Sequence, residues 1–188
     1  MTQHVKQISL MLFIASFFLI GCSHTKRVTG IPNNESIRSR IKIKNNIPPV
    51  QIQTGKVDPD ELVAFAESLV GIPYHYGGKS KETGFDCSGF LWFVFNHFDI
   101  KVPRTAAAYS FAGKEVEIAD SKRGDLILFT GSNPNIETVG HIGLITNNKN
   151  NKITFIHAAS GGNKGVVLSQ MSEYFVTRFV KVNRIFRF

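Results

Sequence analysis

One segment decides the fold: Phe85-Asp86-Cys87-Ser88-Gly89-Phe90-Leu91-Trp92-Phe93-Val94-Phe95-Asn96-His97. It predicts a helix from Cys87 to about His97, with Asp86 as the residue that caps it. The helix is apolar on almost every side, and a helix of that kind belongs in the centre of a domain. We therefore expect a buried helix that begins with a thiol.

Other helices lie close to this segment, and strands come after them. A helix is predicted to start at Asp58-Pro59, with Glu61 completing a capping-box pattern, and to end at Gly71. A short third helix is predicted from Thr105 to Gly113. Five later segments have sequence patterns typical of β-strands: residues 125–130, 140–146, 152–158, 165–169 and 178–188. This order predicts an α+β domain whose N-terminal helices pack on a mostly antiparallel sheet of five to six strands.

The first 21 residues have the pattern of an export signal peptide. Lys6 supplies a positive start, and residues 8–20 form a 13-residue run dominated by apolar side chains, too short to span a bilayer comfortably. The run ends in Leu19-Ile20-Gly21-Cys22, which resembles a bacterial lipobox. We therefore expect Cys22 to be the lipidated N-terminus of the mature chain, anchored to a bacterial membrane and facing the periplasm or cell wall. A buried N-terminal helix is the weaker alternative, because the run would be apolar all round and lacks a cap.

The net positive charge is concentrated outside the predicted domain. The 188-residue chain has a formal net charge of +8, and residues 22–55 hold six basic side chains and one acidic one. Residues 56–188, the predicted globular domain, hold 15 basic and 13 acidic side chains. A domain this close to neutral lacks the basic face that nucleic-acid binding needs. The basic segment is interpreted as a flexible tether that suits an anionic membrane surface.

The chain has two cysteines, Cys22 and Cys87. If Cys22 carries lipid, Cys87 has no partner for a disulfide, and a lone thiol in an exported protein either reacts usefully or is buried. A helix N-terminus can lower a thiol pKa from about 8.5 into the range of roughly 3.5–7.5. The polar neighbours Asp86 and Ser88 favour a reactive thiol over a structural one.

A thiol nucleophile needs a base that a third group holds in place. Of the six histidines, His141 and His157 fall on neighbouring predicted strands. A hairpin centred on Lys149 pairs them directly and pairs Gly143 with Phe155, so that both imidazoles point to one sheet face. The small Gly143 would leave room for the cysteine helix to approach.

Zinc binding is the competing interpretation, because two histidines and a cysteine can ligate zinc. The spacings of 54 and 16 residues between Cys87, His141 and His157 fit no compact zinc motif. We expect neither a metal nor another cofactor.

A glycine-containing loop, Tyr74-His75-Tyr76-Gly77-Gly78, precedes the cysteine. Its glycines would let the backbone approach a substrate closely. The hydroxyl of Tyr74 could donate to the oxyanion of a tetrahedral intermediate, although a tyrosine packed against the helix has the same spacing. The motifs Pro103-Arg104-Thr105 and Arg123-Gly124-Asp125 are interpreted as a helix start and a turn before a strand, without a catalytic role.

Six motifs follow in order along the chain: Gly71-Ile-Pro-Tyr74-His-Tyr-Gly-Gly78, Phe85-Asp-Cys87-Ser-Gly-Phe90, Pro103-Arg-Thr105, Gly124-Asp-Leu126, Gly140-His141-Ile-Gly143 and Phe155-Ile-His157-Ala158. Together they resemble the NlpC-type cell-wall peptidases, a branch of the papain-like cysteine peptidases, over roughly residues 58–188. Two loops look longer than is usual in that family, one before Phe85 and one between the two histidines. Both lie at the edge of the expected site, so their length bears on subsite preference and not on catalysis.

The resemblance implies a papain-like core and a site within it. It implies Cys87 as nucleophile, His141 as base and His157 as the group that orients the base. It also implies Tyr74 at the oxyanion or substrate side, and substrate contacts near Asp86 and Ser88. No cofactor is implied.

The expected domain organisation is a signal peptide at residues 1–21, a lipidated basic tether at 22–55 and a catalytic domain at 56–188. The expected activity is hydrolysis of peptidoglycan peptide stems or cross-links, at a γ-D-glutamyl–diaminopimelate or a D-alanyl–diaminopimelate bond. An N-acetylmuramoyl-L-alanine amidase and a non-catalytic wall-binding lipoprotein remain alternatives. We expect a monomer whose partners are peptidoglycan stems and, through its lipid, the membrane.

Overall fold

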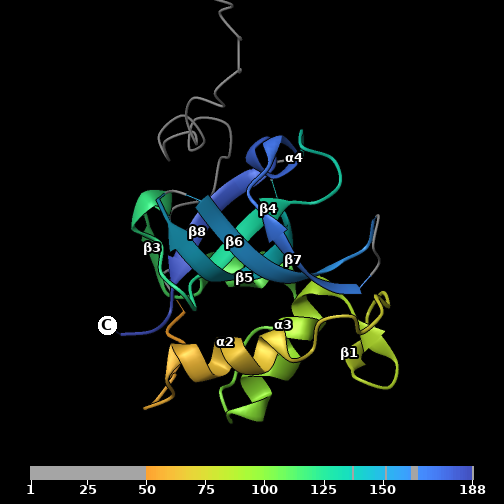
Figure 1. Cartoon of the computed structure of the whole chain (residues 1–188), viewed down its shortest axis with the longest axis vertical. Helices are drawn as coiled ribbons and strands as arrows, with labels where there is room; N and C mark the ends of the chain where they lie inside the picture. Colours follow the sequence, from red (N-terminus) through yellow and green to blue (C-terminus); the bar gives the residue numbers. More distant parts are fainter. Residues whose placement is uncertain (1–49, 137, 151, 162–164, 188) are drawn as a thin grey trace, which may run out of the picture.

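The computed structural model describes residues 50–136, 138–150, 152–161 and 165–187 (Figure 1). The predictions for the signal peptide, for Cys22 and for residues 22–49 of the tether lie outside this part of the chain. Within it, no helix is both long enough and apolar enough to cross a membrane.

Two α-helices form where the sequence predicts them. Helix α2 spans Pro59–Glu67, and the Asp58 side chain caps it by accepting the N–H of Asp60 at 2.8 Å. Helix α3 spans Cys87–His97, and the Asp86 carboxylate caps it by accepting the N–H of Gly89. An aspartate at the N-cap satisfies a backbone donor that the helix itself leaves unpaired. The start of α3 is therefore fixed by the residue beside the cysteine.

The third predicted helix is present in a tighter form. It is the 3-10 helix η1, Ala106–Phe111, and a second 3-10 turn, η2, covers Ile118–Asp120. A short helix α4, Glu173–Val176, comes just before the last strand. Four residues carry too little periodicity to be recognised in a sequence, so α4 was not predicted.

An antiparallel sheet of six strands makes up the rest of the domain, which confirms the predicted α+β class. A separate two-stranded hairpin, β1 (Lys79–Ser80) with β2 (Gly84–Phe85), lies before α3. The main sheet has the order β3-β8-β4-β5-β6-β7. Its strands are β3 Lys114–Val116, β4 Leu126–Thr130, β5 Val139–Lys149, β6 Lys152–Ala159, β7 Gly165–Gln170 and β8 Phe179–Arg184.

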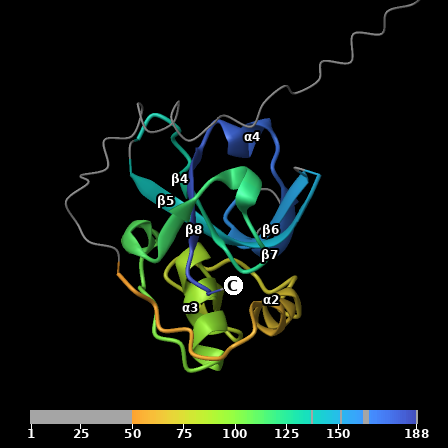
Figure 2. The same ribbon diagram turned by 90° about the vertical axis from the view of Figure 1, so that its left-hand side faces the viewer.

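The sheet separates two apolar layers. Helices α2 and α3 lie against one face, and α4 lies at the other side of the sheet (Figures 1 and 2). Buried side chains such as Leu62, Phe90 and Ile142 fill the layer beneath the helices. A second layer on the opposite face contains Phe129 and Phe155, and Phe175 of α4 packs against it. The cysteine helix is thus held centrally, as its apolar sequence predicts.

The β5–β6 hairpin has a register that differs from the predicted one. Leu144 pairs with Ile156, and after a bulge the pairing continues to Lys149 with Lys152. The predicted direct pairing of His141 with His157 was therefore wrong by two positions, because the strands extend further into the turn than its asparagines suggest. A shift of two keeps the alternation of faces, so both imidazoles remain on the same side of the sheet.

The packed part of the chain includes residues that the sequence analysis assigned to the tether. Val50 forms a parallel bridge with Ala112, and the side chain of Ile52 is 7% exposed within the core. Residues 50–55 therefore lie against the domain, and the predicted boundary at residue 56 falls inside the packed structure.

Candidate active site

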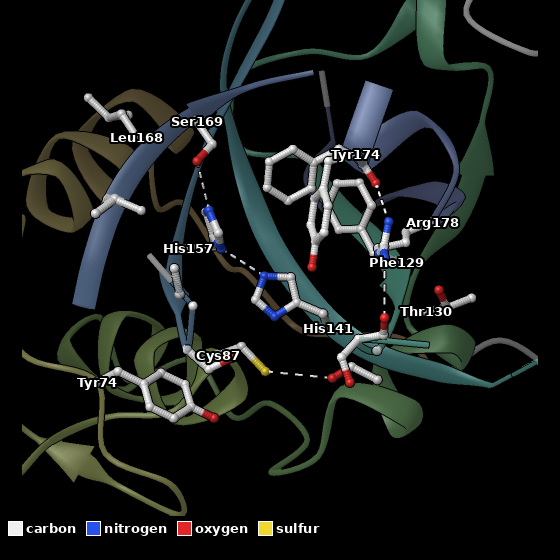
Figure 3. Close-up of a pocket in the computed structure, with 18 residues that line it drawn as sticks. Tyr74, Cys87, Phe129, Thr130, His141, His157, Leu168, Ser169, Tyr174 and Arg178 are labelled. Atoms are coloured by element: carbon white, nitrogen blue, oxygen red, sulfur yellow. Dashed lines mark hydrogen bonds between the residues drawn. The ribbon is translucent and has the colours of Figure 1, made fainter. Parts of the chain in front are cut away.

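Cys87 opens onto a cavity of about 670 Å³ that extends across the end of the sheet (Figure 3). The thiol is half-buried, and its Sγ lies 4.0 Å from the carbonyl oxygen of Gly140 at the start of β5. The cavity lining also contains His141, His157 and Tyr74. The structure therefore brings four of the residues predicted for the site to one cavity.

The electrostatic environment of the thiol is the opposite of the expected one. Burial raises the pKa of Cys87, and the neighbouring Asp86 carboxylate raises it further. Hydrogen bonds from backbone groups, including those of Ser88 and Cys87 at the helix start, lower the same pKa by less. The helix terminus does favour a thiolate, but desolvation and a like charge outweigh it. The expectation of a lowered thiol pKa was therefore wrong.

The two predicted histidines contact each other directly. His141 Nε2 and His157 Nδ1 lie 2.7 Å apart, with the rings at 83°. Figure 3 shows the second ring nitrogen of His141 on the side that faces the Cys87 sulfur. The order of the side chains is therefore Cys87, His141, His157, which is the order that a nucleophile, its base and an orienting group require.

Both imidazoles are held neutral by their surroundings. Burial lowers the pKa of His141 to about 4. Burial and the adjacent His141 lower the pKa of His157 to about 3. The ring of His157 is 3% exposed and packs beside Phe155 and Phe175, at centroid distances of 5.1 and 5.6 Å. At neutral pH this pair can accept a proton, and it does not already carry one.

Gly143 lies in close contact with the neighbouring strand β6. A Cβ at this position would meet the Phe155 ring at 2.9 Å, the Ile156 carbonyl oxygen at 3.0 Å and His157 Cβ at 3.3 Å. The three atoms nearest to a Cβ at this position all belong to β6, so the missing side chain makes room for Phe155, the Ile156 carbonyl and His157.

The loop before the cysteine places Tyr74 at the cavity. Tyr74 forms a bridge with Phe85, and its ring lies beside Cys87 in Figure 3. Burial raises the pKa of its phenol, and so do the nearby Cys87 and Asp86, so the hydroxyl keeps its proton. A protonated hydroxyl beside the thiol has the chemistry of an oxyanion donor.

Gly78 of this loop and Gly89 of α3 allow close packing within the chain, whereas a Cβ on Gly77 would meet nothing within 4 Å. A Cβ on Gly89, in the first turn of α3, would overlap the carbonyl oxygen of Gly78. A Cβ on Gly78 would overlap the carbonyl oxygen of Gly84. This close backbone approach packs the Tyr74 loop against the start of α3.

Asp86 and Ser88 are bound by a residue to which the sequence analysis gave no role at the site. The Arg104 guanidinium donates to both carboxylate oxygens of Asp86, at 3.1 and 3.0 Å, and to Ser88 Oγ at 3.0 Å. It also donates to the Gly77 carbonyl at 2.8 Å. Asp86, Ser88 and Arg104 do not line the cavity. The contact brings together segments 18 residues apart, and no spacing in the sequence signals it.

Two further features of the site were not predicted. Ser169 of β7 lies with its Oγ 2.9 Å from His157 Nε2, so it extends the line of side chains by one. Arg178 packs over the Tyr174 ring at 3.8 Å and donates to the carbonyls of Tyr174 and Ser132. That clamp joins α4 to the loop after β4 and forms the far wall of the cavity (Figure 3).

The remaining described histidines lie elsewhere. His97 stacks on Phe65 at a centroid distance of 3.8 Å, as suits a structural histidine at the end of α3. His75 is exposed and does not line the cavity. Within the described ranges, no group of three or more histidine, cysteine, aspartate or glutamate side chains is arranged to hold a metal ion.

A helix that begins with a cysteine, packed on an antiparallel sheet that carries the facing histidines, defines a papain-like α+β fold. The peptidoglycan hydrolase RipB of Mycobacterium tuberculosis has a solved structure of this kind, with a TM-score of 0.57, 27% identity and 72% of each chain covered. The model of the NlpC/P60 family matches residues 71–184. The chain belongs to the NlpC/P60 family.

Two curated relatives show how the similarity is distributed. A probable endopeptidase of Haemophilus influenzae is 40% identical over 180 residues, which cover 94% of this chain and 97% of that protein. The probable peptidoglycan endopeptidase LytE of Bacillus subtilis is 36% identical over 127 residues. That match covers 66% of this chain and 34% of LytE, so this chain matches about a third of that relative's length.

Proposed function

We propose that the protein is a cysteine peptidase that hydrolyses the peptide stems or cross-links of bacterial peptidoglycan. The observation that carries the proposal is the 2.7 Å contact between His141 and His157 at the wall of the cavity that holds the Cys87 thiol. Membership of the NlpC/P60 family and the peptidoglycan endopeptidase among its relatives support the choice of substrate.

The proposed first half-reaction makes a thioester. His141 Nδ1 takes the thiol proton of Cys87 while the sulfur attacks the carbonyl carbon of the scissile amide. The carbonyl electrons move to oxygen, and the Tyr74 hydroxyl donates a hydrogen bond to that oxyanion. The intermediate then collapses, the C–N bond breaks, and the imidazolium of His141 returns its proton to the leaving amine.

The second half-reaction releases the acid. His141 removes a proton from water, the resulting hydroxide adds to the thioester, and the Cys87 sulfur leaves and is protonated again. His157, in contact with the other ring nitrogen of His141, holds the ring orientation through both steps. The pKa directions fit proton transfer during attack: burial raises the pKa of the thiol and lowers that of the imidazole, so the resting pair is neutral.

The direct test is digestion of purified peptidoglycan followed by mass spectrometry of the soluble muropeptides. We expect new amino termini at diaminopimelate, and the fragment masses identify the bond as γ-D-glutamyl–diaminopimelate or D-alanyl–diaminopimelate. Cys87→Ser is the matched control, because it changes one atom and should fold while losing hydrolysis.

Other products would contradict the proposal in distinct ways. Glycan chains freed of whole stems would identify an N-acetylmuramoyl-L-alanine amidase. Binding to peptidoglycan without any new fragment, equal for the wild type and Cys87→Ser, would identify a non-catalytic wall-binding protein. Activity that survives in Cys87→Ser would exclude this thiol as the nucleophile.

A further inference from the structure

Ser169 ends the line of side chains that starts at Cys87. It lies on β7, beside β6, and its Oγ is 2.9 Å from His157 Nε2. Among the described residues this is the one hydrogen-bond partner of the Ser169 side chain. Ser169 is half-buried and also lines the cavity (Figure 3).

We propose that Ser169 is a positioning residue of the active site, whose hydroxyl oxygen accepts the Nε2–H of His157 and thereby fixes the tautomers of both histidines. The proposal rests on the proposed peptidase function for its catalytic consequence. Its structural content, the location of two protons, stands on the geometry of the two imidazoles and the hydroxyl.

The proton positions follow one from another. A neutral imidazole carries one N–H, so His141 can accept the Cys87 proton at Nδ1 only if its own hydrogen is on Nε2. That Nε2–H points at His157 Nδ1, 2.7 Å away, which must then be the acceptor. The hydrogen of His157 is therefore on Nε2, where it needs an acceptor, and Ser169 Oγ is the atom within reach.

The buried surroundings of His157 make a hydrogen-bond acceptor for its Nε2–H important. His157 is 3% exposed and packs against the rings of Phe155 and Phe175, which offer no lone pair to an N–H. A buried N–H without a partner costs more than an ordinary hydrogen bond gains. Because Ser169 lines the cavity, its hydroxyl can donate its own hydrogen bond to water.

The reversed arrangement would disable the base. If Ser169 donated to His157 Nε2, the hydrogen of His157 would sit on Nδ1 and point at His141 Nε2. His141 would then carry its hydrogen on Nδ1, facing the thiol, and could not accept a second proton without becoming an imidazolium. The two arrangements predict different protonated nitrogens, so they can be distinguished by measurement.

The first experiment is nitrogen-15 NMR of the histidine side chains in the full-length wild-type protein near pH 7. We expect both His141 and His157 to be neutral with hydrogen on Nε2. An Nδ1–H tautomer at His157 would overturn the proposal. This measurement needs no substrate and no variant, so it is decided whether or not the protein proves to be a peptidase.

The second experiment compares Ser169→Ala with Ser169→Thr in muropeptide hydrolysis. Ser169→Ala removes the acceptor, so we expect kcat to fall about tenfold with little change in KM, and the His157 tautomer to become mixed. Ser169→Thr keeps a hydroxyl and should restore both. An unchanged kcat and tautomer in Ser169→Ala would overturn the proposal.

Two controls separate positioning from general disruption. Ser172→Ala makes the same chemical change at an exposed serine before α4 that forms no side-chain cap, and it should leave kcat and the tautomers unchanged. In a His157→Ala background, Ser169→Ala should cost nothing further, because the two residues act as one unit. An additive loss would show that Ser169 acts independently of His157. Wild-type inactivity with the expected tautomers would reject the peptidase proposal while keeping the Ser169 assignment.

Discussion

At the scale of residues, burial favours the neutral forms of four titratable side chains in the candidate site. These are the Cys87 thiol, the imidazoles of His141 and His157, and the Tyr74 phenol, and all are partly or fully buried. Burial raises the pKa of the thiol and of the phenol and lowers the pKa of each imidazole, so the neutral form is favoured in every case. A thiolate–imidazolium pair formed in advance would have to overcome that desolvation. In the proposed mechanism, the proton therefore moves as the bond forms.

The shifted histidines make the folded state sensitive to acid. In the unfolded chain each imidazole binds a proton below about pH 6.5, whereas folding holds the pKa of His141 at about 4. The unfolded state therefore binds more protons between these values, and stability must fall as the pH drops below 6.5. For His141 alone we expect a loss on the order of 2 kcal/mol between pH 8 and pH 5.

Urea denaturation at several pH values measures this loss. The double variant His141→Gln/His157→Gln should keep part of the packing and remove both titrations, so its free energy of unfolding should depend less on pH. Equal pH dependence in the wild type and the double variant would contradict the assigned histidine shifts.

Asp86 and Arg104 act on the thiol with opposite signs. The Asp86 carboxylate raises the pKa of Cys87, and Arg104 holds that carboxylate in a bidentate ion pair. Asp86→Asn keeps a residue that caps helices well but removes the charge, so it should lower the thiol pKa. Arg104→Met should raise it. We expect alkylation rates at pH 8 to rise and fall, respectively, by about threefold to tenfold, for pKa changes of half to one unit.

Alkylation with iodoacetamide, followed by intact mass, gives both rates. Arg123→Met is the matched control, because Arg123 makes a comparable ion pair with Glu67 in another part of the domain. It should leave the rate of Cys87 unchanged. Rates that move in the same direction for Asp86→Asn and Arg104→Met would contradict the electrostatic account.

At the scale of elements, the β5–β6 hairpin decides whether the histidines meet. Continuing the observed register puts Gly143 opposite His157, and a Cβ on Gly143 would lie 3.3 Å from His157 Cβ. Gly143→Ala would crowd the Phe155 ring, a backbone carbonyl and His157 Cβ at once. We expect a destabilisation of about 1–3 kcal/mol and a loss of activity larger than the stability change explains.

Thermal unfolding and muropeptide hydrolysis of the same preparation test this prediction. Gly161→Ala is the control for stability, because a Cβ there meets nothing within 4 Å and its backbone needs no positive φ. If Gly143→Ala is as stable and as active as the wild type, the hairpin has room that the geometry excludes.

The hairpin also shows how far sequence reasoning reaches. Local signals located α3 and its cap at Asp86, the beginning of β6 at Lys152 and the shared face of the two histidines. The exact pairing could not be predicted, because the strands continue to Lys149 and Lys152 at the turn and a bulge between Ile145 and Asn147 then changes the register by one. Strand β3 was missed for a similar reason: three residues become a strand by pairing with β8, far along the chain.

Residues of the candidate site could be predicted where they lie in recognisable motifs, and not where they lie outside them. Cys87, His141 and His157 are recognisable by residue type and spacing, whereas Tyr74 was assigned to the site by the family resemblance. Ser169 is not, because serine on an edge strand is common, and its meaning depends on the β6–β7 pairing. The direction of the thiol pKa was wrong because a sequence reveals the helix start, but not the burial that opposes it.

At the scale of the whole molecule, the domain is a sheet with α2 and α3 on one face and α4 on the other (Figures 1 and 2). The cavity of the candidate site is lined by residues of β4, β5, β6 and β7. The packed structure includes Val50 and Ile52, so the chain enters the domain beside η1. Fully extended, the 28 residues from Cys22 to Val50 could span at most about 100 Å, which bounds how far the domain could act from an anchor.

The last prediction concerns that anchor. The apolar run at residues 8–20 followed by Leu19-Ile20-Gly21-Cys22 predicts that Cys22 becomes a lipidated N-terminus. Cys22→Ala should leave the protein unprocessed or release it from membranes, because one side chain carries the lipid, while Cys87→Ser should remain anchored. Membrane fractionation and intact mass measure both properties. A Cys22→Ala protein of mature size that still partitions with membranes would mean that the attachment lies elsewhere in the chain, and that the basic residues before Val50 do not serve a lipid anchor.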